Sequence, residues 1–386
     1  MDQERMLSQE DELHWLALRM VPGLGTRKSA QLIETFRTPL AIFRASRSEL
    51  EASGLAPSIA QSIASGCAFE EAVEQQQKLA ECGAQLVPMS DPRYPPALQQ
   101  IFDPPPMLFV RGKVDLLSTL MIAIVGTRRP TAYGTTVAGR FAKDLAIAGL
   151  TVTSGMARGI DTAAHRATLE AGGDTVAVFG CGVDQIYPTE NRKLCGQIVE
   201  QGVAISEFPM GTPAYPQNFP VRNRIIAGMS AGVVVVEGGE YSGSSITAKL
   251  AIEQGREVFA VPGNVTSKMS WGPNLLIKQG AKLVQEWNDV VTELKPEDRR
   301  RLAEKCRKQL NLNEGESTGP APASISHVAR TVLGALRPDA PVGLDHLVET
   351  LQGTSSSEII ATLFELELAG LVRQVPGKSF LRVWAD

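Results

Sequence analysis

The stretch Met121-Ile122-Ala123-Ile124-Val125-Gly126-Thr127-Arg128 decides the fold, because five apolar residues lead without interruption into a glycine, a hydroxyl and a cation. A continuous apolar run is typical of a strand that is buried on both faces of a parallel sheet. Similar runs return at 150–153, 175–179, 203–206, 233–237, 257–261 and 282–284. Helix-length segments separate them, near 135–148, 160–171, 190–201, 222–229 and 244–254. This alternation predicts an α/β fold with a Rossmann-like, mainly parallel sheet.

The segment before this sheet is helical. Residues 1–85 carry apolar side chains at helical spacing and predict a small helix-hairpin-helix or SAM-like domain. Its turn Val21-Pro22-Gly23-Leu24-Gly25 is of the kind that presents backbone amides to a phosphate, and a degenerate second version lies around 53–55. Few cations surround the first turn beyond Arg27 and Lys28, so a tight connection without a ligand is the alternative.

Residues 86–294 are predicted to form the extended Rossmann-like domain. Its first part, 86–120, is rich in proline and is expected to be a connector with one added strand at 107–110. Residues 295–324 are predicted to be a linker. The linker is charged and helical to about residue 310, and rich in Gly, Pro, Ser and Glu over 311–324.

Residues 325–386 predict a winged helix, with helices near 325–336, 343–351 and 356–369 followed by a β-hairpin. The third helix is the one that would enter a major groove. It contains Glu358, Glu365 and Glu367 and no lysine or arginine, which opposes phosphate contact. A protein-interaction or regulatory role is therefore favoured over DNA binding by this domain.

The composition limits the function. The chain has 386 residues, 43% hydrophobic content and a net charge of −4, which argues against coating duplex DNA through bulk positive charge. Residues 121–290 contain 15 Lys plus Arg against 14 Asp plus Glu, so a nucleic-acid site there must be local. The five cysteines are scattered and never in a C-x-x-C pair, which predicts reduced thiols and no metal site.

The N-terminus Met1-Asp2-Gln3-Glu4 is polar and acidic, and no apolar run approaches the roughly 20 residues that span a bilayer. We therefore expect a cytoplasmic protein without a membrane partner.

Three glycine-rich strand ends offer backbone N–H groups, hydroxyls or a cation where a helix could begin: Gly126–Arg128, Ser154–Asp161 and Tyr241–Lys249. Such turns bind polyanions in α/β sheets. None matches G-x-G-x-x-G or G-x-x-x-x-G-K-S/T, so a dinucleotide or nucleoside-triphosphate site is not predicted. A surface ion pair is the alternative for Arg128.

The stretch Gln217-Asn218-Phe219-Pro220-Val221-Arg222-Asn223-Arg224 has the chemistry of a phosphate clamp with a stacking platform. We expect Phe219 to lie in a loop, where it could stack on a base, or alternatively to plug the core beneath that loop. Arg222 and Arg224 should point to different sides of an early helical turn. One could then clamp phosphate while the other holds the loop.

Two further residues could support acid–base chemistry. Asp161 could cap its helix, orient Arg158 or act directly, and the first two are favoured because Asp is common in a first helical turn. His165 lies four residues later on the same face, but no motif places a Ser or Cys nucleophile. A packed structural histidine is favoured, and no catalytic residue or enzymatic activity is predicted.

In order along the chain stand Asp91-Pro92-Arg93-Tyr94-Pro95, Pro104–Gly112, Val125–Arg128, Gly155–Asp161, Tyr187-Pro188 with Asn191, Asn218–Ile226 and Gly243–Ala248. From about Trp15 to the C-terminus the chain thereby resembles the DprA/Smf DNA-processing proteins. The resemblance implies binding of single-stranded DNA and its transfer to the RecA recombinase during uptake of transforming DNA. It also implies a homodimer formed through the central domain, and it indicates no cofactor.

We expect Arg128, Phe219, Arg222, Arg224 and Lys249 to form one pocket for single-stranded DNA. The full set of predicted binding residues is Gly126, Thr127, Arg128, Gly155, Arg158, Gly159, Phe219, Arg222, Asn223, Arg224, Gly243, Ser244, Thr247 and Lys249.

The main alternative is a nucleotide hydrolase on the same fold. The turn Glu237–Ser244 is similar to the phosphate-binding turn of the family that includes the cytokinin-activating phosphoribohydrolases. Those enzymes carry P-G-G-x-G-T, and this chain lacks the leading proline, which puts nucleotide hydrolysis in doubt.

Overall fold

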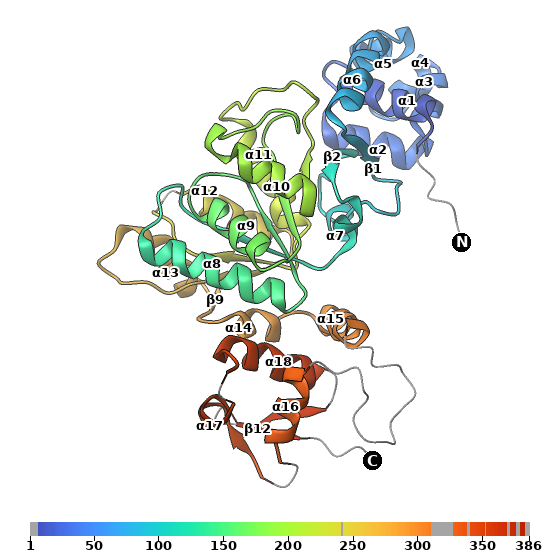
Figure 1. Ribbon diagram of the computed structural model, residues 1–386. Helices are drawn as coiled ribbons and strands as arrows, with labels where there is room; N and C mark the ends of the chain where they lie inside the picture. Colours follow the sequence, from blue (N-terminus) through green and yellow to red (C-terminus); the bar gives the residue numbers. More distant parts are fainter. Residues whose placement is uncertain are drawn as a thin grey trace.

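The computed structural model describes residues 7–240, 242–309, 327–337, 340–351, 353–368, 371–375 and 379–382. Figure 1 shows a body of helices at one end, a central sheet flanked by helices, and a small C-terminal body at the other end. The segment 311–324, predicted to be a flexible linker, lies outside the described residues.

Six helices form the N-terminal body: α1 (Gln9–Met20), α2 (Thr26–Phe36), α3 (Pro39–Arg44), α4 (Arg47–Ala52), α5 (Pro57–Ser65) and α6 (Phe69–Cys82). The predicted turn 21–25 joins α1 to α2, and its degenerate copy joins α4 to α5. Gly23 and Gly54 have φ of 75° and 88°, a region that only glycine enters without strain. Each is followed by a buried leucine, Leu24 or Leu55. Phosphate binding by either turn stays a prediction.

The central sheet has nine strands: β1 (Gln85–Pro88), β2 (Met107–Gly112), β3 (Met121–Val125), β4 (Thr151–Ser154), β5 (Thr175–Val178), β6 (Val203–Ser206), β7 (Gly232–Val235), β8 (Glu257–Ala260) and β9 (Lys282–Leu283). Their order is β1-β2-β6-β5-β4-β3-β7-β8-β9. The strands from β6 to β9 in that order are parallel, whereas β2 pairs antiparallel with both β1 and β6. The predicted Rossmann-like sheet is confirmed.

Seven helices lie between the strands of this region: α7 (Pro96–Gln99), α8 (Ala132–Ile147), α9 (Ile160–Glu170), α10 (Arg192–Gln201), α11 (Asn218–Gly228), α12 (Gly243–Glu253) and α13 (Trp271–Lys278). Helix α14 (Trp287–Thr292) follows the last strand. Short 3-10 turns are η1 (Val114–Ser118), η2 (Thr189–Asn191) and η3 (Lys268–Ser270). Because side chains alternate across a strand, those of β3 pack into two hydrophobic cores, one on each face of the sheet. Ile122 and Ile124 pack with α8 and α9, whereas Ala123 and Val125 pack with α11 and α12.

Helix α11 begins earlier than the sequence pattern indicated. The prediction placed Phe219 in a loop, but Phe219 is the second residue of the helix. That prediction treated Pro220 as a helix breaker. Proline is tolerated in a first turn, because the N–H that it lacks would have no intrahelical acceptor there.

The C-terminal body is the predicted winged helix: α16 (His327–Ala335), β10 (Val342–Gly343), α17 (Leu344–Thr350), α18 (Ser356–Leu368), β11 (Val372–Val375) and β12 (Ser379–Arg382). Its strands pair in the order β10-β12-β11. Helix α15 (Pro296–Gln309) precedes it, as expected from the charged segment. No helix among the described residues is both long and apolar enough to cross a membrane.

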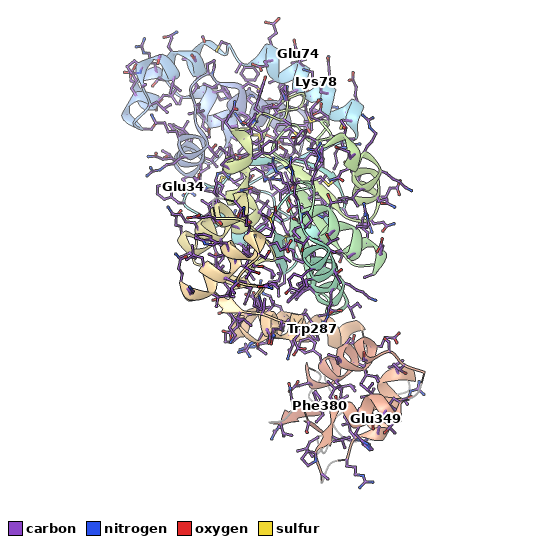
Figure 2. All side chains as sticks on the ribbon, turned by 90° about the vertical axis from the view of Figure 1, so that its left-hand side faces the viewer. Glu34, Glu74, Lys78, Trp287, Glu349 and Phe380 are labelled. Atoms are coloured by element: carbon purple, nitrogen blue, oxygen red, sulfur yellow. The ribbon has the colours of Figure 1, made fainter. Side chains whose placement is uncertain are left out.

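The third helix of the winged helix, α18, packs against its own chain. The Phe364 ring meets the edge of Trp287 in α14, with ring centroids 4.5 Å apart and planes at 85°. Ile360 and Phe364 both contact the apolar cluster that contains Val290 and Val291. Figure 2 shows Trp287 at the junction between the central region and the winged helix. The face of α18 that carries Ile360 and Phe364 is therefore engaged within the chain.

This docking contact can be tested with Phe364→Ala. Ile359, Leu363 and Leu366 form the winged helix's own core, so removal of Phe364 should leave that core folded. The aromatic pair itself contributes roughly 0.5–1.5 kcal/mol beyond its buried area. We expect the winged helix to separate from α14, seen as a larger radius of gyration in small-angle X-ray scattering. Glu358→Gln, on the exposed part of α18, is the control, and equal scattering of both variants would contradict the docking.

Candidate nucleic-acid interface

A cleft of about 600 Å³ lies where the carboxyl ends of the strands meet the helices α11 and α12. In open α/β sheets ligands bind at this edge. Nine predicted residues line the cleft: Gly126, Thr127, Arg128, Phe219, Arg222, Asn223, Gly243, Ser244 and Thr247. The fold thus brings most of the predicted residues to one cleft, and their binding role stays a prediction.

The loop that carries Arg128 is held at both ends by Glu237. The Thr127 N–H donates to the Glu237 carbonyl at 2.7 Å. The Glu237 carboxylate accepts from the Thr131 N–H at 2.9 Å and from its hydroxyl at 2.6 Å. A side chain at Gly134 would overlap this carboxylate, because an added Cβ would lie 2.1 Å from Oε2. The buried carboxylate thereby occupies the amino end of α8, where other α/β folds hold a phosphate.

Arg128 itself is exposed, and it makes none of the ion pairs found among the described residues. Its guanidinium carbon lies 5.1 Å from the centroid of the Phe219 ring, a cation–π contact. The alternative interpretation of Arg128 as a surface ion pair is not what the structure shows.

Phe219 is half-buried and has neighbours on several sides. The Tyr187 ring stacks on it, with centroids 5.5 Å apart and planes at 29°. A side chain at Gly180 would collide with it, because an added Cβ would lie 2.7 Å from its Cδ1. Tyr187 lines the cleft but was not among the predicted binding residues. Its only signal in the sequence was the Tyr187-Pro188 motif.

Arg222 lines the cleft from a buried position, with 4% of its surface exposed. It donates to the Gly155 carbonyl at 2.6 Å and to the Val178 carbonyl. Burial lowers its pKa to about 10, and Asp161 opposes this shift, so the guanidinium stays charged near neutral pH. A side chain at Gly155 would collide with this guanidinium, because an added Cβ would lie 2.7 Å from Nη1. Arg222 therefore joins strand ends as well as lining the cleft.

Asp161 supports the same turn. Its carboxylate accepts from the N–H groups of Gly155 and Ala157 at 3.1 and 3.2 Å. Burial raises its pKa, and Arg222 and these two N–H groups oppose that rise. Asp161 thus holds the turn before its helix, whereas Arg158 bonds to Glu190, which favours the structural interpretation of Asp161. Gly159 lies in the same connection with φ of 79° and packs against the Thr127 carbonyl.

Three predicted cations do not reach the cleft. Arg224 is buried and pairs with Glu207 at 2.6 Å and Asp103 at 3.0 Å. Residues two apart on a helix lie on opposite sides, which is why Arg222 enters the cleft and Arg224 does not.

The other two cations lie outside the cleft lining. Lys249 is exposed on α12, two residues beyond Thr247, and its Nζ lies 3.9 Å from the Glu253 carboxylate. Arg158 pairs with Glu190 at 2.7 Å outside the cleft lining. The prediction of one pocket containing Arg224 and Lys249 is wrong.

The start of α12 forms the far wall of the cleft. Ser242 caps this helix by accepting from the Ser245 N–H at 3.4 Å, and its hydroxyl lies 2.8 Å from that of Ser244. The Thr247 hydroxyl donates to the Gly243 carbonyl at 3.3 Å, and Asn223 reaches the same carbonyl at 3.5 Å. The first turn of a helix has N–H groups without intrahelical acceptors, which favour an anion.

His165 is a structural residue. It is fully buried, and its Nδ1 lies 2.7 Å from the Thr175 hydroxyl. That hydroxyl already donates to the Val152 carbonyl at 2.8 Å, so His165 must donate from Nδ1. Its Nε2 is buried without a partner among the described residues. Desolvation lowers the pKa of His165 to about 3, so the ring is neutral and does not form an acid–base pair with Asp161.

The buried neutral ring predicts acid sensitivity. Its folded pKa of about 3 lies below the ordinary value of 6.5, so the unfolded chain takes up the proton first. Stability is then complete above pH 6.5 and is lost as the pH falls toward 3. Between pH 7.5 and 5.5, the wild type should lose about 1.4 kcal/mol of unfolding free energy through this group, whereas His165→Asn should not. Urea unfolding at both pH values measures the difference, and identical losses would contradict the assignment.

The chain is similar to known proteins over most of its length. The family model described as DNA recombination-mediator protein A matches residues 85–295, and a model of the DprA winged helix domain matches residues 316–378. Protein Smf of Escherichia coli K12 is 40% identical over 302 residues, which are 76% of each chain. The DNA processing protein DprA of Bacillus subtilis is 46% identical over 215 residues, 55% of this chain and 72% of that protein.

Two solved structures are similar over much of the chain. The DNA processing protein A of Streptococcus pneumoniae has a TM-score of 0.66 and 32% identity, covering 75% of this chain and 99% of that one. The DNA processing protein A of Helicobacter pylori, described for its single-stranded DNA binding mode, has a TM-score of 0.50 and 30% identity. It covers 55% of this chain and 98% of that one.

Proposed function

Because the chain belongs to the DprA/Smf family of DNA-processing proteins, we propose that it binds single-stranded DNA in the cleft between the strand ends and α11 and α12. One observation carries the proposal: Arg128 is an exposed cation without an ion pair among the described residues, and it lies over the half-buried ring of Phe219. A cation beside an aromatic ring is the arrangement that binds a phosphate and a stacked base together.

The geometry favours a single strand over a duplex. Stacking on a protein ring requires a base that has left its own stack, which a single strand supplies at little cost. The cleft offers two exposed arginines, Arg128 and Arg129, and one helix start, not a wide basic face. The near balance of charge over residues 121–290 likewise disfavours duplex coating. Binding through stacking and phosphate contact is independent of base sequence.

We propose that binding proceeds without bond-making chemistry. The carboxylates of Asp161 and Glu237 are engaged in hydrogen bonds to the backbone or to Thr131. The ring of His165 is buried and neutral. Glu237 also occupies the amino end of α8, which leaves the amino end of α12 for the phosphate. These contacts disfavour the hydrolase alternative.

The family membership supports a wider role. We propose that the protein protects incoming single strands and helps to load the RecA recombinase during natural transformation, in line with the family's description as recombination mediators. We further propose a cytoplasmic homodimer formed through the central domain. The division into residues 1–85, 86–294, 295–324 and 325–386 remains our proposed domain assignment.

Salt dependence tests the electrostatic part of the cleft. Wild-type affinity for oligo-dT should fall with salt, with a log–log slope near −0.7 for each phosphate neutralised. Arg128→Ala should weaken binding and make the log–log slope shallower by about 0.7, the contribution of one phosphate contact. Fluorescence-anisotropy titrations at several salt concentrations measure both quantities. Lys249→Ala, an exposed cation outside the cleft, is the matched control. A flat salt response, or equal affinity for duplex, would contradict the proposal.

Stacking is tested separately with Phe219→Ala. Loss of the ring should weaken oligo-dT binding by about 1–3 kcal/mol and leave the salt slope unchanged, because no phosphate contact is removed. Phe102→Ala removes an aromatic ring that is 75% exposed and lies outside the cleft, so it should bind as the wild type does. If Phe219→Ala retained full affinity, stacking in this cleft would be excluded.

A further inference from the structure

We propose that Tyr187 is a base-stacking residue for single-stranded DNA, and that Arg158 beside it supplies the next phosphate contact. The strand would then leave the cleft across Phe219 and Tyr187 toward η2. This inference rests on the proposed function and extends its site by two side chains.

The first argument is the crowding of Phe219. Tyr187 stacks on its ring, Arg128 lies 5.1 Å from its centroid, and Gly180 approaches its edge too closely to carry a side chain. Tyr187 therefore covers part of the Phe219 ring. The Tyr187 ring, by contrast, is 39% exposed and forms the outer member of the aromatic pair. A base that extends this stack therefore meets Tyr187 first.

The second argument is the order of cations and rings. Arg128 lies at Phe219, and Arg158 lies beside Tyr187, which contributes with Glu190 to a raised pKa of the Arg158 guanidinium. The two aromatic rings, Phe219 and Tyr187, thus lie between two cations, Arg128 and Arg158. Alternation of aromatic rings with cations is the pattern by which proteins follow a single strand.

The third argument is that Arg158 can exchange its partner. Its bond with Glu190 is 2.7 Å long, but the two side chains are 53% and 60% exposed. Exposed ion pairs contribute little, about 0–1 kcal/mol. A phosphate, which an arginine can grip through two parallel hydrogen bonds, can displace such a carboxylate.

The fourth argument is that the segment is rigid. Asn191, at the end of η2, is buried and donates to the Met156 carbonyl at 3.1 Å and to the Thr162 hydroxyl at 2.8 Å. This ties the segment that carries Tyr187 to the turn that carries Arg158. Because these two segments are tied to each other before binding, little ordering of their backbone is required when the strand arrives.

The test measures dissociation constants for oligo-dT of increasing length, from about 4 to 16 nucleotides, a range that covers typical single-strand sites. Tyr187→Leu keeps apolar contact with Phe219 but removes the ring, whereas Tyr187→Phe keeps the ring. We expect Tyr187→Leu to weaken binding of the longer oligonucleotides by roughly 5- to 150-fold, the equivalent of one lost stack, and Tyr187→Phe to bind as the wild type does. Arg158→Ala should make the salt slope shallower for the longer oligonucleotides only.

The controls separate this inference from the proposed function. Arg128→Ala should weaken binding at every length. If Arg128→Ala weakens binding while Tyr187→Leu does not, the stacking role of Tyr187 is overturned and the cleft assignment stands. If neither variant weakens binding, the proposed function itself fails.

A second measurement requires no variant. Irradiation of wild-type protein bound to an oligonucleotide that carries 5-iodouracil should crosslink the peptide containing Tyr187, as identified by mass spectrometry. Crosslinks at Phe219 that never include the Tyr187 peptide would also overturn the inference.

Discussion

The buried guanidinium of Arg222 is the interaction on which the site depends. It donates to the carbonyls of Gly155 and Val178, so one side chain from α11 joins the ends of β4 and β5. Asp161 supports the same turn through the N–H of Gly155 and offsets part of the cost of burying the positive charge. A buried charge that loses its hydrogen-bond partners is strongly destabilising. The position of α11, and with it the stacking ring of Phe219, follows from this contact.

Glu237 plays the corresponding role on the other side of the cleft. Its carbonyl and carboxylate fix both ends of the loop that carries Arg128. Two buried charged residues thus hold an exposed cation and a half-buried ring in place, and neither needs to touch the ligand through its charge. This arrangement supports a preformed binding site.

In the winged helix, too, contacts within the chain occupy part of the surface. Its third helix is acidic, and its apolar residues Ile360 and Phe364 are packed against α14. A winged helix usually reads a major groove with its third helix, and both the acidic charge and the packing of α18 oppose that use. The contacts of α18 with α14 are contacts within the chain, and the protein-interaction or regulatory role favoured by the charge pattern stays a prediction.

The sequence by itself determined the α/β fold, the winged helix and the loops that form the cleft, because apolar runs and glycine-rich strand ends are local patterns that parallel strands bring to one edge. Only the tertiary structure decided which arginines are available. Arg128, Arg222 and Arg224 look alike in sequence, but one is exposed, one joins strand ends and one pairs with Glu207. Their partners come from residues distant along the chain, and a two-residue step on a helix reverses the direction of a side chain. For the same reason the stack of Tyr187 on Phe219, 32 residues later, appeared only when the chain folded.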